Sequence, residues 1–411
     1  TKIGYGSPNK SGKASSHGSP LGADEIKLVR KALNWKTKPF DIPNKILKDW
    51  RKIGQRGEIL EKKWNKALKR KKIKFNQTLK NNFTTVLKKE KENAIKEPKS
   101  LATRKCSEMT LNALTKQKNN LIGGSADLAG SNNTKTKNHK IIKPGDFTGD
   151  YIHYGVREHA MSGVMNGIAL HSNLIPYGGT FLIFSDYCKP SIRLSALMKK
   201  RVIYVMTHDS IGLGEDGPTH QPIEQLSGLR AIPNLNVFRP ADRIETIECW
   251  EHALKSSKTP SVLSLTRQNL NPVRKTYPSK NLCSLGAYEV LRTNKKINLT
   301  ILASGSEVNL ALEVSHKLAK DKIYSKVISM PCMELFELQS KSYKNKILEE
   351  TKFKISIEAG SSDCWKKYVG DNGIAFGIDE FGKSAPYKDI YKYFGLESKN
   401  IKNITKKLLN K

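Results

Sequence analysis

The sequence predicts an α/β protein in which two consecutive parallel-sheet domains follow a truncated α/β segment. Between residues 100 and 275, apolar runs of buried-strand type at 121–124, 202–206 and 261–265 alternate with helical stretches, which is the pattern of βαβ units. A second alternation of this kind starts near residue 285. The length of 411 residues agrees with this organisation, because a domain takes about 100–200 residues.

The first hundred residues predict helices rather than a sheet. Residues 1–22 are rich in Gly, Ser and Pro and predict a loop. Apolar residues at a spacing of about 3.6 predict a helix over 23–35. Residues 44–97 have the pattern of amphipathic helical connectors, which we expect to end before Pro98.

The second α/β pattern follows a linker at 274–280. Strand-like runs occur at 299–303, 327–330 and 355–357, and a helical stretch occupies 307–318. This order of strand, helix and strand again predicts a sheet with crossover helices.

The net charge of +34 arises from 72 Lys and Arg against 38 Asp and Glu. Residues 51–100 hold 17 basic and 5 acidic side chains, whereas residues 151–270 hold 12 and 10. A basic patch such as 69–72 could bind phosphate backbones, but few aromatic residues accompany it for base stacking. We therefore expect a lysine-rich solvated surface and no nucleic-acid partner, although the charge would attract anionic substrates.

Hydropathy and cysteine usage favour a cytoplasmic protein without a membrane partner. No run approaches the roughly 18 apolar residues of a transmembrane helix. The six cysteines are scattered without a Cys-x-x-Cys pair, which favours reduced thiols. The chain starts with neither a methionine nor an apolar signal segment, so we expect it to begin within a longer protein.

The stretch 207–222 is unusually dense in chemically active residues. It holds two histidines, three acids and three glycines directly after the strand predicted at 202–206. Open α/β sheets bind ligands at the carboxyl ends of their strands, so this position favours a binding site. The glycines would let backbone approach a ligand, and His208 and His220 could transfer protons near neutral pH. A solvated loop with incidental histidines is the alternative.

Glu158 is a second candidate, in a segment that leads into a helix of small residues. The helix dipole would favour its charge, but its apolar neighbours would make burial costly unless a partner shared a proton. On the residues alone, a capping or ion-paired glutamate is the commoner interpretation.

Three aromatic residues form a third candidate. Phe181, Phe184 and Tyr187 are three residues apart, so we expect them to share one face of a helix. Taken alone, this pattern is more typical of core packing than of a ring-binding site.

Residues 377–384 match the expression G-x-x-x-x-G-K-[ST] of a phosphate-binding loop. Asp379 and Glu380 would repel phosphate there, and Pro386 interrupts the helix that should follow. We therefore reject nucleotide binding by this segment.

Six segments together resemble transketolases, in which they occur in the same order. The segments are Ser-His-Gly-Ser-Pro-Leu-Gly at 16–22, Gly-Gly-Ser-Ala-Asp-Leu at 123–128, Gly-Val-Arg-Glu at 155–158, the stretch 208–222, Thr-Arg-Gln-Asn at 266–269 and Phe-Gly-Lys-Ser-Ala-Pro at 381–386. The stretch 208–222 is highly specific, because deoxyxylulose-phosphate synthases and 2-oxoacid dehydrogenase components share only its shorter core.

The resemblance implies a thiamine-diphosphate enzyme that moves a two-carbon ketol unit from a ketose phosphate to an aldose phosphate in the pentose phosphate pathway. It further implies an active site between the subunits of a homodimer and Mg²⁺ or Ca²⁺ on the diphosphate. Glu158 would hydrogen-bond the aminopyrimidine ring, and Phe184 would stack on that ring with support from Phe181 and Tyr187. Because a ring nitrogen would share the proton of Glu158, the catalytic interpretation is then favoured.

The resemblance also assigns substrate contacts. Arg104, Ser131 and Arg267 would bind the phosphate group, for which the arginine fork is suited. The other assigned residues are His208 and Asp216 on the sugar, His220 near the reacting carbonyl, His17 at both cofactor and substrate, and Asp127 and Leu128 at the dimer seam near the thiazolium. His17 and His220 would join Glu158 as catalytic residues.

The departures from the family concern the metal site. Transketolases hold the metal and diphosphate with a Gly-Asp-Gly sequence and a later Asn, and this chain has no Gly-Asp-Gly. We expect residues 1–75 to be the end of the diphosphate-binding domain, 76–98 a basic linker, 99–275 the pyrimidine-binding domain, and 285–411 the Rossmann-like C-terminal domain. The chain would then be a fragment without metal ligands and inactive by itself.

Two alternatives stay open. One is an enzyme like the deoxyxylulose-phosphate synthases, which Arg267 and the full stretch 208–222 disfavour and which ribose 5-phosphate as acceptor would test. The other is a non-catalytic basic protein that keeps the fold but binds nucleic acid or a partner.

Overall fold

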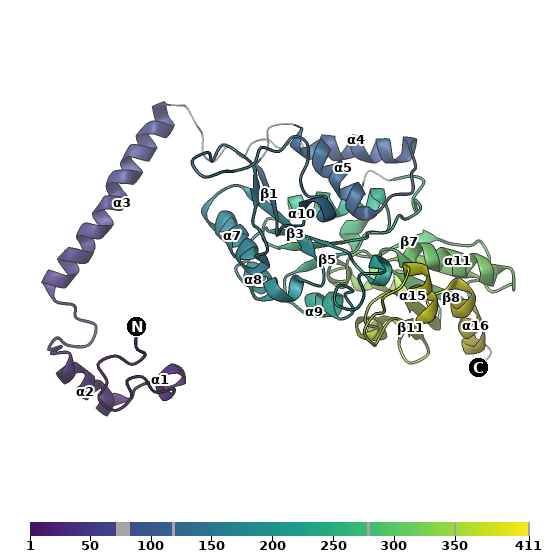
Figure 1. Ribbon diagram of the computed structural model, residues 1–411. Coiled ribbons are helices and arrows are strands. Elements are labelled where there is room, and N and C mark those ends of the chain that lie inside the picture. Colours follow the sequence, from purple (N-terminus) through teal and green to yellow (C-terminus); the bar gives the residue numbers. More distant parts are fainter. Residues whose placement is uncertain (71–82, 117–119, 278–279, 349–350, 410–411) are drawn as a thin grey trace. The chain divides into compact units, whose positions relative to one another are not determined.

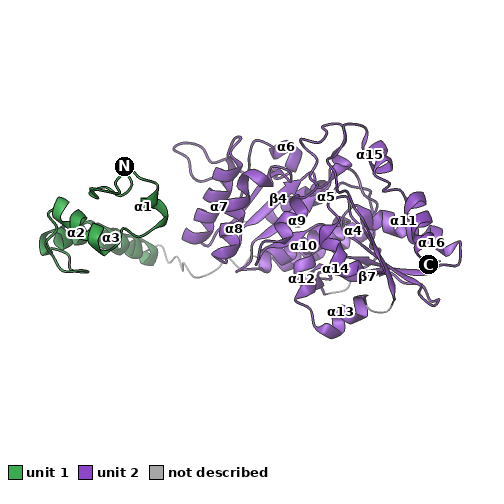
Figure 2. Cartoon of the chain, turned by 90° about the horizontal axis from the view of Figure 1, so that it is seen from below, with its two compact units in different colours: residues 1–78 green, residues 79–411 purple. Residues whose placement is uncertain are grey.

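The computed structural model describes residues 1–70, 83–116, 120–277, 280–348 and 351–409 (Figure 1). The chain divides into two compact units, residues 1–78 and residues 79–411 (Figure 2). Among the described residues, no helix is both long and apolar enough to cross a membrane.

The first unit is helical, as its sequence predicts. It contains α1 (Ser15–Gly18), α2 (Ala23–Ala32) and α3 (Asn44–Arg70). Glu25 of α2 fixes the preceding loop, because its carboxylate accepts hydrogen bonds from the Asn9 backbone N–H at 3.0 Å and from Asn9 Nδ2 at 2.9 Å.

The second unit contains two β-sheets, of which the first has six strands. Its strand order is β2-β1-β3-β4-β6-β5, and all of its paired strands are parallel. The strands are β1 (Leu121–Ser125), β2 (Tyr151–His153), β3 (Ile175–Phe181), β4 (Ile203–Thr207), β5 (Asn236–Phe238) and β6 (Ser261–Leu265). The three strands predicted between residues 100 and 275 are β1, β4 and β6.

Helices cover both faces of this sheet (Figure 1). One face packs against α4 (Phe83–Lys96), α5 (Thr103–Thr115) and α10 (Arg243–Lys255), and the other against α7 (Glu158–His171), α8 (Ser185–Leu197) and α9 (Gln225–Arg230). On β4, Val205 belongs to the first core and Met206 to the second. Because both faces are buried, the strand is a continuous apolar run.

Part of the predicted basic linker 76–98 is a packed helix. Residues 76–82 lie outside the described residues, and residues 83–96 form α4. Leu87 of α4 is fully buried in the core beside α5 and α10. Lys91 of the same helix is buried as well, and its Nζ pairs with Glu251 Oε2 of α10 at 3.2 Å.

The second sheet has the order β11-β10-β8-β9-β7 and is mixed, because β7 runs antiparallel to β9. Its elements are β7 (Tyr288–Leu291), β8 (Leu299–Ala303), β9 (Ser325–Ser329), β10 (Phe353–Ile357), β11 (Ile374–Phe376), α11 (Glu307–Ala319), α12 (Met333–Glu337), α13 (Lys341–Leu348), α14 (Lys366–Val369), α15 (Tyr387–Tyr393), α16 (Ser398–Leu409), η2 (Cys283–Leu285) and η3 (Asp363–Trp365). The α/β class is confirmed. The antiparallel edge strand was not predicted, because β7 is only partly buried and has no apolar run.

Buried charges join the two sheets. Arg239, which follows β5, is fully buried; its Nε donates to Asp209 Oδ2 at 2.9 Å and its Nη1 bonds Glu307 of α11. Arg230 of α9 makes two hydrogen bonds to Glu358, of 2.6 and 2.8 Å. Burial would raise the pKa of the Glu358 carboxyl, but the charge and hydrogen bonds of Arg230 lower it to about 2. The two sheets are therefore fixed to each other by ion pairs as well as by apolar packing.

Candidate active site

The loop after β4 lies at the carboxyl edge of the six-stranded sheet, as the sequence predicts. It begins with His208 and Asp209, which are 4% and 1% exposed, and continues through the 3-10 turn η1 (Ile211–Leu213). Gly214 and Gly217 have φ angles of 91° and 78°, a left-handed conformation that glycine adopts without steric cost. These turns let the loop fold back on the sheet edge.

The aromatic residues lie beside this loop, but the expectation that they share one helix face is wrong. Phe181 ends β3 and Phe184 immediately precedes α8, because the chain turns between the strand and the helix. The two rings are stacked, with centroids 5.8 Å apart and planes at 19°. The His208 ring lies 4.4 Å from Phe181, the His220 ring 5.4 Å from Phe184, and Tyr187 5.8 Å from Phe184.

Glu158 is the first residue of α7 and is 9% exposed. Within the part of the chain that the structure describes, its carboxylate has no hydrogen bond or ion pair to a protein group. Cys188 of α8 lies near both Glu158 and Phe184: burial raises the pKa of its thiol to about 12, the Glu158 charge contributes to that increase, and its Sγ donates to Phe184 O at 3.9 Å. Cys188 therefore connects the acid, which has no partner among the described residues, to the residue that carries one of the stacked rings.

His208 lies within a cationic group. Burial and then the positive charges of Arg104, Arg267 and His220 lower the pKa of the His208 imidazole to about 3. Its Nδ1 is buried without a hydrogen-bond partner among the described residues. Arg104 Nη1 donates to Ser131 O at 2.7 Å, so Ser131 lies next to this cluster of cationic side chains. Two arginines beside a neutral imidazole suit an anionic ligand that also carries hydroxyl groups.

Arg267 follows β6 and reaches the same loop. Its Nη1 donates to Leu213 O at 2.6 Å and lies 3.7 Å from Glu215 Oε2. Asp216 is exposed on this loop and makes no hydrogen bond or ion pair with the described residues. The structure thus places Asp216 on the loop without bringing it into contact with the arginines.

Asp127 and Leu128 follow β1 at the same edge of the sheet. Asp127 is exposed and has a left-handed φ of 62°, which aspartate tolerates better than most residues. The Leu128 N–H donates to Ser125 Oγ at 3.1 Å and precedes α6 (Ala129–Asn132). His17 lies exposed in α1 of the first unit, whereas the other predicted site residues lie in the second.

The His208 ring gives a direct test of the cationic group. We expect the imidazole to stay neutral down to about pH 4, because burial and the neighbouring arginines lower its pKa to about 3. Ring chemical shifts followed by NMR against pH will measure this pKa. In an Arg267→Met variant the pKa should rise, while an Arg292→Met variant, at the exposed end of β7, should leave it unchanged. A His208 ring that titrates near pH 6.5 in the unsubstituted chain would refute the arrangement.

Comparisons with known proteins match the whole chain. The family models of the transketolase thiamine diphosphate binding domain, the pyrimidine binding domain and the transketolase-like C-terminal domain match residues 1–91, 99–273 and 286–397. A transketolase of Sinorhizobium medicae is 46% identical over 408 residues, which cover 98% of this chain and 59% of that protein. The chain belongs to the transketolase family.

Other family members agree in sequence and structure. A transketolase of Buchnera aphidicola is 43% identical over 98% of this chain and 62% of its own length. The structure of a Leishmania mexicana transketolase has a TM-score of 0.84 and 36% identity, covering all of this chain and 61% of that one. A Pichia stipitis transketolase in complex with sedoheptulose 7-phosphate gives a TM-score of 0.85 with the same identity. This transketolase-family chain thus spans about three fifths of the length of these relatives.

Two buried polar residues of this transketolase-family site were not predicted. Asn132 of α6 is fully buried, and its Nδ2 donates to Thr180 O at 3.1 Å and to Thr207 Oγ1 at 2.6 Å, so it joins the ends of β3 and β4. Gln221 is 2% exposed directly after His220. Both lie in or just after recognised segments, at 123–128 and 208–222, but Asn132 stands between Ser131 and Asn133 and Gln221 between His220 and Pro222, so no local pattern indicated that they are buried.

The residues present fit the pyrimidine half of thiamine diphosphate. A flat heterocycle with a ring nitrogen that takes up a proton requires an apolar wall and an acid, and the Phe181–Phe184 stack and the unpartnered Glu158 carboxyl provide both. The described residues do not provide a comparable site for the divalent metal ion. Among the described residues no group of three or more His, Cys, Asp or Glu side chains could hold an ion.

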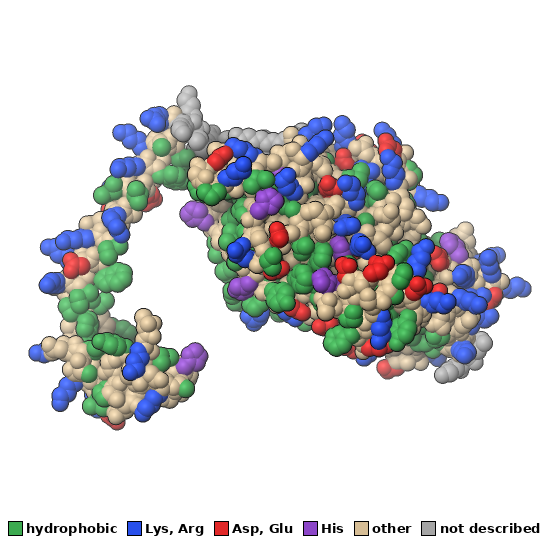
Figure 3. Space-filling view, viewed as in Figure 1, with side chains coloured by type: hydrophobic (Ala, Val, Ile, Leu, Met, Phe, Trp, Pro, Cys, Tyr) green, Lys and Arg blue, Asp and Glu red, His purple; other side chains and the backbone are tan. Residues whose placement is uncertain are grey.

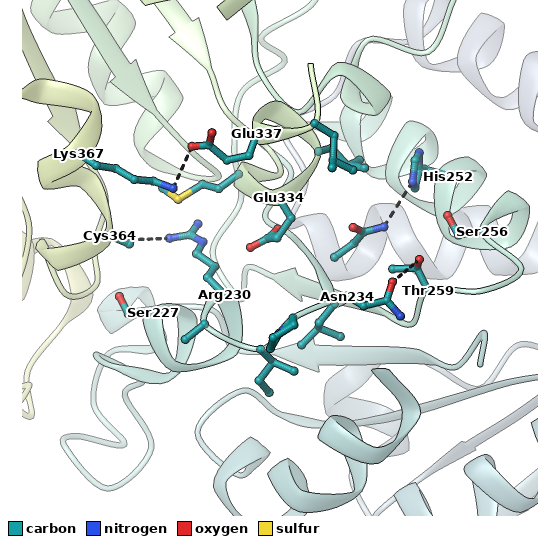
Figure 4. Close-up of a pocket in the computed structure, with 18 of the residues that line it drawn as sticks. Ser227, Arg230, Asn234, His252, Ser256, Thr259, Glu334, Glu337, Cys364 and Lys367 are labelled. Atoms are coloured by element: carbon teal, nitrogen blue, oxygen red, sulfur yellow. Dashed lines mark hydrogen bonds and ion pairs between the residues drawn. The ribbon is translucent and has the colours of Figure 1, made fainter. Parts of the chain in front are cut away.

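A large cavity lies elsewhere, between the two sheets. Its volume is about 930 Å³, and its lining includes Arg230 of α9, His252 of α10, Glu334 of α12 and Cys364 of η3. Figure 4 shows Arg230 between Glu334 and Cys364; Arg230 Nη1 lies 3.2 Å from Cys364 Sγ. None of the predicted site residues lines this cavity, so it is distinct from the candidate active site.

Proposed function

We propose that this chain is the part of a transketolase that holds the pyrimidine ring of thiamine diphosphate and the sugar phosphate during two-carbon transfer from a ketose phosphate to an aldose phosphate. The observation that carries the proposal is Glu158, which is 9% exposed, has no partner among the described residues and lies near Cys188, a residue that contacts Phe184 of the Phe181–Phe184 stack. Membership of the transketolase family supports it.

The proposed cofactor residues would hold a proton on the pyrimidine ring and orient that ring. Bound thiamine diphosphate would supply an electron sink for the transferred carbons. Glu158 would keep a proton on a ring nitrogen, which offsets the cost of burying its carboxyl. Phe184 would orient the ring by stacking, supported by Phe181 and Tyr187. His17, Asp127 and Leu128 would border the cofactor at the subunit seam.

The proposed substrate residues lie around His208. Arg104, Ser131 and Arg267 would bind the phosphate, because two guanidinium groups neutralise its charge and donate to several oxygens. His208 would contact one sugar hydroxyl, and Asp216 would accept a hydrogen bond from another. His17 and His220 would exchange protons with the reacting carbonyl.

The surface of α7 and α8 is proposed as the seam of a homodimer. Hydrophobic side chains gather on this part of the second unit in Figure 3. They include Val164 and Leu170 of α7 and Leu194 and Leu197 of α8, exposed by 44%, 52%, 46% and 66%. Large apolar patches of this kind mark interaction sites. Glu158 begins α7, so a second copy on this surface would close the site.

The remaining assignments are also proposals. They comprise Mg²⁺ or Ca²⁺ on the diphosphate, a place in the pentose phosphate pathway, a cytoplasmic location, and no nucleic-acid partner. The boundaries predicted at 1–75, 76–98, 99–275 and 285–411 stay predictions too. The many Lys and Arg side chains on the face in Figure 3 would favour the approach of anionic sugar phosphates.

Ligand binding tests the proposed function. The chain should bind ribose 5-phosphate in preference to ribose, because the arginines around His208 recognise the phosphate. An Arg267→Met variant should lose about tenfold in affinity for ribose 5-phosphate, as measured by isothermal titration calorimetry. The control is Arg292→Met, which changes an arginine paired with Glu289 on β7. Equal affinity for the two sugars, or no change in the Arg267 variant, would exclude the proposed phosphate site.

Transfer itself is the second test. In a chain extended to the full length of its transketolase relatives, with thiamine diphosphate, Mg²⁺, a five-carbon ketose phosphate and ribose 5-phosphate, the proposed reaction yields a seven-carbon ketose phosphate and a three-carbon aldose phosphate. Formation of a deoxyxylulose phosphate from pyruvate instead would assign the chain to the related synthases.

A further inference from the structure

The loop 208–223 is fixed largely by residues 283–411, which form the second sheet and its helices and are called the C-terminal half below. Gln221 is the centre of these contacts: its Nε2 donates to Gly214 O at 2.8 Å within the loop and to Lys383 O at 2.9 Å outside it. Gly382 leaves no free space there, because a Cβ at this position would lie 1.7 Å from Gln221 Oε1. One buried amide thus closes the loop on itself and attaches it to the segment before α15.

Two further hydrogen bonds connect the same partners. Ser384 Oγ donates to Glu215 O at 2.5 Å, and the Ser361 N–H donates to Ile223 O at 2.9 Å. In addition, Ile211 of η1 is fully buried in the core of the second sheet, together with Ile301 and Ile355. The loop therefore has its apolar anchor in the C-terminal half, although its strand belongs to the first sheet.

The beginning of the loop is held by the buried charges. Asp209 pairs with Arg239, and Arg239 pairs with Glu307. Glu307 also accepts from the Ala359 N–H at 3.0 Å and from Tyr391 Oη of α15 at 2.7 Å. These partners hold the carboxylate of Asp209 in place. Because His208 is the adjacent residue, its backbone position is restricted as well.

We propose that the C-terminal half positions the loop that carries His208, Asp216 and His220, and that Gln221 and Gly382 are the positioning residues that join the two. This inference rests on the proposed function, since it assumes that the loop binds sugar phosphate. The segment 377–384, which we rejected as a phosphate-binding loop, would thus support the loop 208–223 through the contact of Gly382 with Gln221. Affinity for substrate then depends on residues that do not touch it.

Gln221→Leu tests the proposal, because leucine has a similar volume and no hydrogen bonds. The matched control is Gln339→Leu, whose Nε2 donates to Leu335 O at 2.8 Å within the C-terminal half and away from the loop. Backbone hydrogen exchange followed by mass spectrometry should be about tenfold faster in peptides covering 208–223 of the first variant only. The unfolding midpoints of the two variants should agree.

A second pair of variants tests the same contact by changing Gly382 instead of Gln221 alone. Gly382→Ala should produce the same local increase in exchange, because its Cβ displaces Gln221. In a Gly382→Ala, Gln221→Ser double variant the contacts at 1.7 and 2.8 Å are removed and only the one to the Cβ of residue 221, at 3.1 Å, remains, so the double variant should be little worse than Gln221→Ser alone. Additive effects would overturn the direct contact.

Ribose 5-phosphate affinity completes the experiment. It should fall about tenfold in Gln221→Leu and Gly382→Ala and stay unchanged in Gln339→Leu. Faster loop exchange with unchanged affinity would overturn the positioning role, as would faster exchange spread evenly over the chain. If the unsubstituted chain binds no sugar phosphate, the proposed function fails, while the exchange data still decide whether the C-terminal half holds the loop.

Discussion

In a chain extended to the full length of its transketolase relatives, replacing Glu158 with alanine should reduce two-carbon transfer by about 10²–10⁴-fold, the range that general acid–base groups contribute. In the structure Glu158 is 9% exposed, its carboxylate has no hydrogen bond or ion pair among the described residues, and Cys188, which its charge affects, contacts Phe184. Asp186 of α8, two residues after Phe184, is exposed and accepts from Gln225 Nε2 at 2.9 Å, so we do not expect it to replace Glu158. Initial rates at saturating ketose phosphate and ribose 5-phosphate will measure the effect.

Two further variants make this result specific. Glu158→Gln preserves the volume but cannot share a proton in the same way, so it should be nearly as slow as Glu158→Ala. Glu313→Ala removes an exposed glutamate of α11 and should have no effect. Ribose 5-phosphate affinity should be preserved in all three variants, because Glu158 is assigned to the cofactor. A near-normal rate in Glu158→Ala would remove Glu158 from its proposed role.

Replacing Arg239 with methionine should destabilise the second unit by roughly 3–5 kcal/mol, the cost of leaving buried charges unpaired. Arg239 is fully buried and compensates Asp209 and Glu307, which are themselves buried. Equilibrium unfolding in urea will measure the loss. The control is Lys366→Met, which breaks an exposed pair with Asp363 and should leave stability unchanged. A neutral Arg239 variant would show that the carboxyls do not need this partner.

The same charges predict how stability depends on pH. The pKa of Glu358 is about 2 in the folded chain, below its ordinary value of about 4.3 in the unfolded chain. Between these values the unfolded state binds more protons, so this contribution is present above about pH 4.3 and is lost as the pH falls towards 2. Stability measured from pH 6 to pH 2.5 should therefore decrease less steeply in a Glu358→Gln variant. Identical slopes would contradict the assignment of the shift to Glu358.

Much of the fold and site could be predicted from local sequence. The runs at 121–124 and 202–206 are strands because both faces of the first sheet are covered, which requires uninterrupted apolar residues. The stretch 208–222 follows directly from β4, so its place at the carboxyl edge is a consequence of chain continuity. Glu158 and the aromatic residues became convincing only through the resemblance to transketolases, since their local patterns favoured a cap and a core.

The remainder depends on contacts between distant residues. Nothing around Arg239 indicates that its partners are Asp209 and Glu307, because ion pairs of this kind are set by how the two sheets meet. Phe181 and Phe184 are stacked although they are not on one helix, and three-residue spacing cannot distinguish a helix from a strand end followed by a turn. The contact between Gln221 and Gly382 could not be predicted from local sequence either. The need for a glycine at position 382 becomes evident only when Gln221 is known to lie against it.

The position of Cys364 has a practical consequence. The six cysteines are free thiols, and five of them are buried, whereas Cys364 is partly accessible at the cavity between the sheets. A maleimide dye should therefore attach to this side chain selectively in the native chain. Because Cys364 adjoins the Arg230–Glu358 pair, the fluorescence of such a label would report when the two sheets begin to separate.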